Sequence, residues 1–312
     1  MSNRVVFFGT PKIAVSCLQA LLDANLQVVA VVTKPDVYIG RKQILQKSDV
    51  KIFANEHHIP VLQPVRVNEI YDELLQLHAD LFVVCAYGKL ISEKILQIPP
   101  FHCVNIHTSL LPRWRGGAPI HYAVWSGDKQ TGVSLMFMTK ELDAGNIIYQ
   151  QAIPIDDKET YHSLYIKLAQ LSYRVLIDKI HSLFTSHVPS QPQDIQFVTI
   201  AKNITRENEK INWNNSNLQI ERQIRGLFDK PIAYTTYINF DVKIYEATCL
   251  DLQTETHPGT IVQISKNGMD VACGNHQILK ITKLQLPGKK PIYLKDMVNG
   301  HHPFKVNHQF NS

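Results

Sequence analysis

Short apolar runs alternate with amphipathic stretches over the first third of the chain. The near-continuous apolar runs predict strands, and they occupy residues 5–9, 28–33, 81–88 and 103–109. Between the first two runs, apolar residues recur at helical spacing over residues 11–25, and further helical segments follow. Apolar strands that alternate with helices are typical of a parallel sheet covered on both faces. The pattern therefore predicts an α/β fold with a doubly wound, mostly parallel, Rossmann-like sheet.

Two further β-rich runs continue this pattern toward the middle of the chain. Residues 132–139 and 146–155 flank the turn ELDAG. They predict an extension at the edge of the sheet, for which antiparallel pairing is one option. A long helix is predicted over residues 160–184, and it would close the first domain.

The composition changes near residue 187. HVPSQPQD, residues 187–194, is polar and contains proline, so it indicates the start of a linker. The helical stretch NLQIERQIRGLF then precedes several short β-rich runs: AYTTYINF, VKIYEATCL, TIVQIS, MDVACG and QILKITKLQL. Short strands at close spacing predict a small, OB-like β-barrel. We therefore expect an N-terminal domain over residues 1–188, a linker over 189–205 and a C-terminal barrel over 206–312.

The composition narrows the class of protein. The chain has 312 residues, of which 45% are hydrophobic and 19% charged, and this argues against disordered and fibrous classes. The formal net charge of +5 fits attraction to a polyanion and also fits plain solubility. The cysteines are widely spaced and form no CxxC pair, which favours reduced thiols over a disulfide framework. With neither a signal-peptide pattern nor an apolar run of about 18 residues, we expect a cytoplasmic protein.

The stretch NIHTSLLPRWRGGAPI, residues 105–120, concentrates polar groups at the end of a predicted strand. Asn105, His107 and Ser109 alternate, so the period of a strand turns them toward one face. In open α/β sheets, ligands bind beyond the carboxyl ends of the strands. An amide and an imidazole there could both donate to a carbonyl oxygen that gains negative charge. Asp143 in ELDAG is the best placed carboxylate to orient the histidine or to receive a proton.

Other interpretations of these residues stay open from the pattern alone. His107 is also explained as a hydrogen-bonded core histidine and Asp143 as a turn former. Ser109 lacks the GxSxG elbow of a nucleophile. FFGTPKIA has one glycine where a dinucleotide fingerprint needs three, and its Thr10 is a candidate helix N-cap. The histidine pairs at 57–58 and 301–302 lack the spacing of a zinc site, so no metal is expected.

Basic residues gather in two regions. The loop over residues 33–51 holds five lysines and arginines around Gly40. A solvated loop is the default interpretation, yet this loop follows a predicted strand that ends at the same edge as the polar crevice. A second cluster comprises Lys280, Lys283, Lys289, Lys290 and Lys295. Barrels with basic faces often bind nucleic acid, although this region also holds many acidic residues.

NIHTSLLPRWRGGAPI followed by ELDAG at this interval resembles the signature of the folate-dependent formyltransferases. The resemblance implies that Asn105 and His107 polarise the formyl carbonyl of 10-formyltetrahydrofolate. It implies that Asp143 organises the transfer and helps to remove a proton from the attacking amine. The residues that it implies for folate binding are Val83, Val84, Ala86, Tyr87, Gly88, Ser109, Leu110, Leu111 and Pro112.

Within that superfamily the chain is most similar to the methionyl-tRNA formyltransferases, over nearly its whole length. The segments that carry the similarity are FFGTPKIAVSCLQALL, TKPDVYIGRK, INWNNSNLQIERQIRGL and LQLPGKKPI. The glycinamide ribonucleotide enzymes fit less well, because they have a glycine-rich phosphate loop and no barrel. Departures from the usual pattern occur in FDKPIAYT and at Val37, Ile39, Gln43 and Thr108, and none falls on the Asn-His-Asp trio.

The similarity implies formyl transfer to the α-amine of methionine on initiator tRNA, for translation initiation. The residues implied for tRNA contact are Arg41, Lys42, Lys47, Lys283, Lys289 and Lys290. A monomer is expected. Two alternatives remain: the same folate chemistry on an amino sugar nucleotide, and an RNA-binding protein in which Asn105, His107 and Asp143 are structural.

Overall fold

The chain forms two compact units, and each unit consists of segments that are not continuous in the sequence. The computed structural model describes residues 3–40, 43–298 and 300–311. The first unit comprises Met1–Pro119, Gln130–Pro154 and Tyr165–Lys202, and the second comprises Ile120–Lys129, Ile155–Leu164 and Asn203–Ser312. The segment predicted as a linker, residues 189–205, therefore lies mostly inside the first unit.

The first unit is built on a sheet with the strand order β10-β9-β7-β6-β1-β2-β5. Its strands are β1 (Arg4–Gly9), β2 (Gln27–Val32), β5 (Val61–Leu62), β6 (Leu81–Cys85), β7 (Cys103–His107), β9 (Gln130–Phe137) and β10 (Ile147–Pro154). The strands from β5 to β7 pair in parallel, whereas β9 pairs antiparallel with β7 and β10 antiparallel with β9. The predicted parallel sheet with an edge extension is confirmed.

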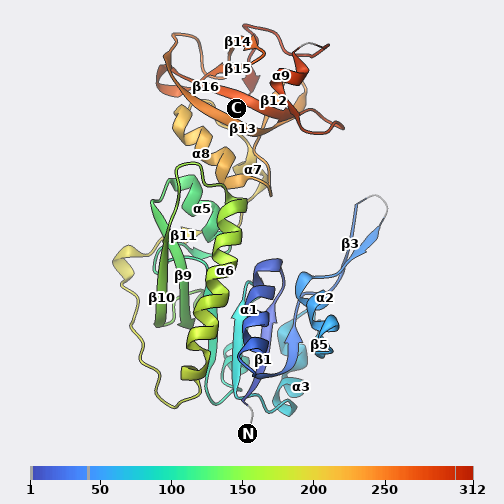
Figure 1. The fold of residues 1–312 in the computed structure, drawn as a ribbon, viewed down its shortest axis with the longest axis vertical. Coiled ribbons are helices and arrows are strands. Elements are labelled where there is room, and N and C mark those ends of the chain that lie inside the picture. Colours follow the sequence, from blue (N-terminus) through green and yellow to red (C-terminus); the bar gives the residue numbers. More distant parts are fainter. Residues whose placement is uncertain (1–2, 41–42, 299, 312) are drawn as a thin grey trace. The chain divides into compact units, whose positions relative to one another are not determined.

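Helices cover both faces of this sheet. They are α1 (Lys12–Asp23), α2 (Asp49–Glu56), α3 (Tyr71–Gln76), α4 (Glu93–Leu96) and α6 (Tyr161–Lys179), with a 3-10 turn before α3 (Val67–Ile70) and another after α6 (Ile180–Leu183). Alternate residues of the central strands, such as Phe8 and Phe82, join Leu74 of α3 and Ile95 of α4 in one core cluster. Figure 1 shows α1 and α6 on one face of the sheet. The sheet is doubly wound, as predicted.

The carboxyl ends of β1 and β6 are tied together by a side chain. Thr10 Oγ1 donates to the Tyr87 main-chain oxygen at 3.0 Å. The prediction that Thr10 caps the first helix is therefore wrong: Pro11 occupies the N-cap position, and no side chain caps it. The strand predicted over residues 81–88 ends at Cys85, because Ala86 and Gly88 adopt the left-handed region with φ of 47° and 72°. The main chain after Cys85 thus leaves the sheet.

The basic loop over residues 33–51 contains a β-hairpin that the sequence pattern did not predict. β3 (Val37–Ile39) pairs antiparallel with β4 (Ile44–Gln46), and Figure 1 shows this arm extending away from the sheet. At its base, Lys51 Nζ bonds to Asp36 Oδ2 at 2.6 Å and to Gln63 Oε1 at 2.5 Å. Hydrogen bonds to Asp36 from Lys51 Nζ and from Gln63 Nε2, the latter 2.8 Å long, lower the pKa of Asp36. The bond between Asp36 and Lys51 ties the start of the arm to α2, which follows the end of the arm.

The second unit is built on an antiparallel sheet with the order β14-β15-β16-β13-β12-β18 and with β17 beside β16. Its strands are β12 (Tyr234–Tyr237), β13 (Phe240–Gln253), β14 (Ile261–Ser265), β15 (Gly268–Ala272), β16 (Gln277–Gln285), β17 (Ile292–Tyr293) and β18 (Phe310–Asn311). Backbone hydrogen bonds between residues 259–261 and 307–310 join the two ends of the sheet. The predicted small barrel is confirmed, although the run over residues 233–240 is interrupted by a turn at Ile238, whose φ is 56°.

The helices of the second unit are α5 (Pro119–Ser126, whose first residue belongs to the first unit), α7 (Arg206–Glu209), α8 (Asn217–Leu227) and α9 (Leu294–Met297). Ser216 starts α8 with a capping box: its side chain accepts from Gln219 N, and the Gln219 side chain accepts from Ser216 N. α8 carries Ile220 and Ile224 into the barrel core. The sequence thus sets both the start of this helix and the face that it buries.

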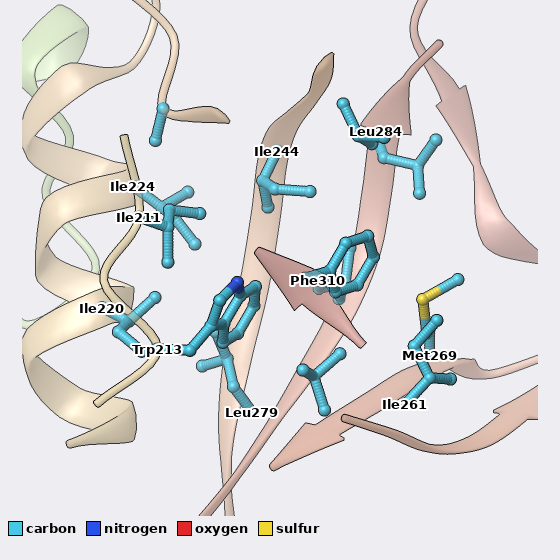
Figure 2. Packing of buried hydrophobic residues seen from close by; sticks show 14 of the residues in the cluster. Ile211, Trp213, Ile220, Ile224, Ile244, Ile261, Met269, Leu279, Leu284 and Phe310 are labelled. Atoms are coloured by element: carbon cyan, nitrogen blue, oxygen red, sulfur yellow. The ribbon is translucent and has the colours of Figure 1, made fainter. Parts of the chain in front are cut away.

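Trp213 lies at the centre of that core. Figure 2 shows it between Ile220 of α8 and Phe310 of β18. Its ring stacks on Phe310 with centroids 5.6 Å apart, and its Nε1 donates to Thr235 Oγ1 at 2.9 Å. The side chain is completely buried. Trp213 therefore connects the segment before α8 to both sides of the barrel.

We expect Trp213→Ala to destabilise the second unit by roughly 3–5 kcal/mol, because it opens a large cavity and leaves Thr235 without this donor. Native-state hydrogen exchange of the amides in β13 and β16 reports on this unit by itself. Leu252→Ala is the matched control, because Leu252 is 56% exposed. Equal exchange rates in the two variants would contradict the central role of Trp213.

Candidate active site

Asn105 and His107 lie on β7 at the carboxyl edge of the sheet. Asn105 pairs with Val84 of β6 on one side and with Met136 of β9 on the other, so it stands between two strands. Both side chains are buried, with 8% and 6% exposure. They point toward one carboxylate, that of Asp143. The structure therefore brings together the three residues singled out from the sequence.

Asp143 is held between these two side chains. Asn105 Nδ2 donates to Asp143 Oδ1 at 3.3 Å, and His107 Nδ1 lies 3.7 Å from Asp143 Oδ2. The Gly116 main-chain N–H donates to the same Oδ2 at 2.8 Å. An amide group has two N–H donors, and the bond to Asp143 uses one of them. The second is available to another acceptor beside Asp143.

The turn that presents Asp143 depends on a close backbone approach. Asp143 itself has a φ of 51°, a conformation that aspartate tolerates better than most residues. A Cβ at Gly145 would stand 1.9 Å from the Phe137 main-chain oxygen, so only glycine fits there. The glycine of ELDAG is thus explained by packing of the turn against the end of β9.

The proton on the His107 ring can be placed from its partner. His107 Nε2 lies 2.9 Å from the Trp114 main-chain oxygen, which can only accept. Nε2 therefore carries a proton, and Nδ1 faces Asp143 and the crevice. In the neutral ring Nδ1 accepts a proton, and in the imidazolium it donates one. His107 can therefore exchange a proton with a group beside Asp143.

The loop after β7 is pinned by hydroxyl and amide groups. Ser109 is 1% exposed and donates from Oγ to the Arg113 oxygen at 2.6 Å. Ser134 Oγ donates to the Ser109 oxygen at 2.6 Å and accepts from Leu111 N at 3.1 Å. Gln150 Nε2 donates to the Leu111 oxygen at 2.9 Å. Ser109 is thus placed as a structural residue of the loop, with its hydroxyl turned to the main chain.

Gln193 and Thr199 also reach the site, and the sequence pattern did not indicate them. Gln193 Nε2 donates to the Asp143 and Gly145 main-chain oxygens, at 2.8 Å each. Thr199 Oγ1 accepts from Trp114 N at 2.8 Å. Both residues lie in the segment predicted as a linker. Its polar, proline-containing composition carries no signal that would distinguish these two residues from their neighbours.

The residues implied for folate binding divide by exposure. Val83, Val84 and Tyr87 are buried, whereas Ala86 and Gly88 are exposed where the main chain leaves β6. Burial raises the pKa of Tyr87 to about 12, so its hydroxyl stays protonated at physiological pH. In the loop after β7, Leu111 is buried, and Leu110 and Pro112 are half-buried. A flat heterocycle can thus meet main-chain atoms of residues 86–88.

The residues implied for tRNA contact lie in two different regions. Arg41 and Lys42 fall outside the described residues. Lys47 is exposed at the base of the β3–β4 arm, and Lys289 and Lys290 are exposed in the turn between β16 and β17. Lys283 differs from them, because its Nζ lies 3.4 Å from both Glu246 Oε1 and the Tyr293 hydroxyl. These contacts raise the pKa of Lys283 against the opposing effect of burial.

The described part of the chain has neither a metal-binding cluster nor a helix that could span a membrane. Over residues 3–40, 43–298 and 300–311, no group of three or more His, Cys, Asp or Glu side chains has a geometry that could hold a metal ion. No helix in those ranges has the length and apolar character needed to cross a bilayer.

Comparison with known proteins gives matches that cover both units. The family model described as formyl transferase matches residues 3–180, and the model described as formyl transferase, C-terminal domain, matches residues 203–302. A methionyl-tRNA formyltransferase of Bacillus cytotoxicus is 41% identical over 299 residues, which are 95% of this chain and 95% of that protein. That of Staphylococcus aureus strain MW2 is 40% identical over 300 residues, 96% of each chain.

Solved structures share the fold at lower identity. The sugar 3N-formyl transferase WlaRD, solved with dTDP and 5-N-formyl-THF, has a TM-score of 0.66 at 21% identity and covers 93% of this chain and 100% of its own. An N-formyltransferase from Helicobacter canadensis was solved with folinic acid and dTDP-3-aminofucose. It has a TM-score of 0.67 at 20% identity, and the match covers 90% of this chain and 99% of that chain. Matches to both family models, together with relatives at about 40% identity over nearly the full length, show that the chain belongs to the methionyl-tRNA formyltransferase family of formyl transferases.

Proposed function

We propose that the protein transfers the formyl group of 10-formyltetrahydrofolate to the α-amine of methionine on initiator tRNA, for translation initiation. The observation that carries the proposal is the nearly full-length match to methionyl-tRNA formyltransferases, which includes the C-terminal unit. The cluster of Asn105, His107 and Asp143 supplies the groups that formyl transfer needs. We further propose that it acts in the cytoplasm as a monomer.

Asn105 and His107 act on the formyl oxygen. 10-Formyltetrahydrofolate supplies an electrophilic formyl carbon when bound. Asn105 Nδ2 and His107 Nδ1 lie beside Asp143. The second N–H of Asn105 Nδ2 donates to the formyl oxygen, and His107 Nδ1 donates to it when the ring carries a proton on both nitrogens. Donors fixed in advance stabilise the negative charge that develops on this oxygen during attack, without a cost of reorganisation.

Asp143 acts on the proton of the attacking amine. Its Oδ2 already accepts from Gly116 N and stands 3.7 Å from His107 Nδ1. This distance is too long for a direct hydrogen bond but allows a shared proton through an intervening group. Asp143 can therefore take a proton from the amine as the new carbon–nitrogen bond forms. The bond between the formyl carbon and the folate nitrogen then breaks, and tetrahydrofolate leaves with a proton on that nitrogen.

The folate is proposed to lie along the exit of β6 and the loop after β7. Ala86 and Gly88 turn main-chain groups out of the sheet, and Leu90 beside them is 81% exposed. Backbone donors and acceptors suit the edge of a pterin, and an exposed leucine suits its apolar face. The proposed contacts are Val83, Val84, Ala86, Tyr87 and Gly88, through the main chain, and Ser109, Leu110, Leu111 and Pro112.

The acceptor is proposed to meet the β3–β4 arm and the barrel. Exposed lysines on both, Lys47, Lys289 and Lys290, suit phosphate groups of a tRNA. Arg41, Lys42 and Lys283 are proposed contacts as well. Because Lys283 is already paired with Glu246, we expect it to contribute less than the exposed lysines.

The function is tested by supplying labelled 10-formyltetrahydrofolate with three acceptors: methionyl initiator tRNA, methionyl elongator tRNA and a dTDP-amino sugar. We expect label on the initiator tRNA alone. Label on the sugar instead would assign the protein to the sugar enzymes that share its fold. Binding of tRNA without any transfer would favour an RNA-binding protein.

Asp143→Asn should lower kcat for formyl transfer by about 10²- to 10⁴-fold, because the amide keeps the bond from Gly116 N but cannot take a proton. Steady-state kinetics with both substrates varied measures the effect. Asp251→Asn is the control, because Asp251 is an exposed carboxylate on the second unit. Unchanged kcat in Asp143→Asn would contradict the proposal that Asp143 takes a proton from the amine.

The Lys289→Ala, Lys290→Ala double variant should weaken tRNA binding and reduce the slope of log K against log salt by about one to two, since each phosphate contact releases counterions. Filter binding over a range of salt concentrations measures the slope. Lys266→Ala with Lys305→Ala removes the same charge from other exposed positions of this unit. A slope that falls equally in both double variants would contradict contact at this turn.

A further inference from the structure

We propose that residues 191–201, which follow the sheet of the first unit and precede the second family domain, form a strap that positions the catalytic trio. In this proposal Gln193 and Thr199 are positioning residues for Asp143 and His107. The inference rests on the proposed formyl transfer, which it deepens. Its evidence is a set of hydrogen bonds that lie wholly within the first unit.

One half of the strap holds the turn that carries Asp143. Gln191 exchanges two backbone hydrogen bonds with Ile147, both 2.8 Å long. Gln193 Nε2 then donates to the main-chain oxygens of Asp143 and Gly145, at 2.8 Å each. A single amide group thus bonds to two carbonyls on either side of Ala144. This fixes the direction in which the Asp143 side chain leaves the turn.

The same Gln193 also connects the two loops of the site. Its Oε1 accepts from Arg115 Nε at 2.9 Å. Arg115 stands between Trp114, whose oxygen accepts from His107, and Gly116, whose N–H donates to Asp143. The side chain of Gln193 therefore sets the spacing between the turn of Asp143 and the loop that bonds to both titratable groups.

The other half of the strap holds that loop. Thr199 Oγ1 accepts from Trp114 N at 2.8 Å, and the Thr199 main-chain oxygen accepts from Arg115 N at 2.9 Å. β8 (Arg115–Gly116) then pairs in parallel with β11 (Ile200–Ala201). The contact is close, because a Cβ at Gly116 would lie 2.5 Å from the Ala201 oxygen. The strap therefore fixes the backbone on both sides of the groups that touch His107 and Asp143.

Trp114 shows that the loop is held against its own preference. Its φ is 63°, a left-handed conformation that is unusual for a bulky residue. Such a conformation persists only where surrounding contacts determine it. The bond from Trp114 N to Thr199 is one of those contacts, and the Trp114 oxygen on the other side accepts the His107 proton. Loss of the Thr199 hydroxyl should therefore release the acceptor that sets the ring tautomer.

The consequence for catalysis is one of geometry. β7 holds the backbone of His107, and the turn holds the backbone of Asp143. Their hydrogen-bond partners, Trp114 and Gly116, are held in place by the strap. A displacement of about 1 Å in a reacting group can lower the rate by about 10²-fold. The strap should thus act on kcat, while substrate binding at other surfaces is kept.

Thr199→Val and Thr199→Ser form a matched pair, because valine keeps the shape and serine keeps the hydroxyl. We expect Thr199→Val in the full chain to lower kcat about 10- to 100-fold with the KM for either substrate changed less than about twofold. Thr199→Ser should restore kcat to within about threefold of the wild type. Equal kcat in Thr199→Val and the wild type would overturn the proposal.

A spectroscopic readout separates positioning from a general loss of structure. Two-bond ¹H–¹⁵N spectra of histidine-labelled protein report which ring nitrogen of His107 carries the proton, with His107→Gln used to assign the signal. We expect the proton on Nε2 in the wild type and a mixture of tautomers in Thr199→Val. A lower melting temperature with an unchanged tautomer and unchanged kcat would mean that the strap only stabilises the fold.

Gln193→Met tests the other half, with Gln196→Met as the control at an exposed position of the same segment. We expect Gln193→Met to lower kcat about 10- to 100-fold and Gln196→Met to leave it unchanged. The tautomer measurement needs no substrate, so it decides the proposal even if the acceptor is not tRNA. Transfer to a sugar amine by the wild type would refute the proposed acceptor and leave the strap intact. Wild-type kcat in Thr199→Val, or in Gln193→Met, would refute the strap and leave the proposed acceptor intact.

Discussion

The candidate site depends on two hydrogen bonds between the loop after β7 and the cluster of Asn105, His107 and Asp143. The Trp114 oxygen accepts a hydrogen bond from His107 Nε2, and the Gly116 N–H donates to the Asp143 carboxylate. Without the first bond, either nitrogen of His107 could carry the proton. Without the second, Asp143 would keep only the Asn105 amide as a hydrogen-bond donor.

The sheet contributes position, and loops contribute orientation. β7 brings Asn105 and His107 to the carboxyl edge between β6 and β9, which is where ligands bind in open α/β sheets. The exits of β1 and β6 lie at the same edge and are tied by Thr10 and Tyr87. The second unit has its own hydrophobic core, which includes Trp213.

The sequence predicted the parts of this arrangement that are local. The apolar runs identified the sheet strands, and the alternation of Asn105 and His107 placed them on one face. The sequence could not show which ring nitrogen of His107 faces Asp143. The other nitrogen is fixed by the Trp114 main-chain oxygen, seven residues later in the chain. Gln193 lies 50 residues from Asp143 in the chain, and Thr199 lies 85 from Trp114. Nothing in a polar, proline-containing segment reveals contacts over such separations. Thr10 was assigned a local role as a cap, but a partner 77 residues away takes its hydroxyl.

We propose that Asn105 and His107, held by Asp143 and the loop after β7, polarise the formyl oxygen. Isotope-edited infrared spectroscopy of a bound ¹³C-formyl folate, without acceptor so that no transfer occurs, tests it directly. We expect the formyl carbonyl stretch to fall in frequency when the folate binds to the wild type. In Asn105→Ala, the frequency of the bound folate should lie closer to that of free folate in water. The proposal would be contradicted if the folate binds to both proteins and its formyl carbonyl stretch has the same frequency in the wild type, in Asn105→Ala and in water.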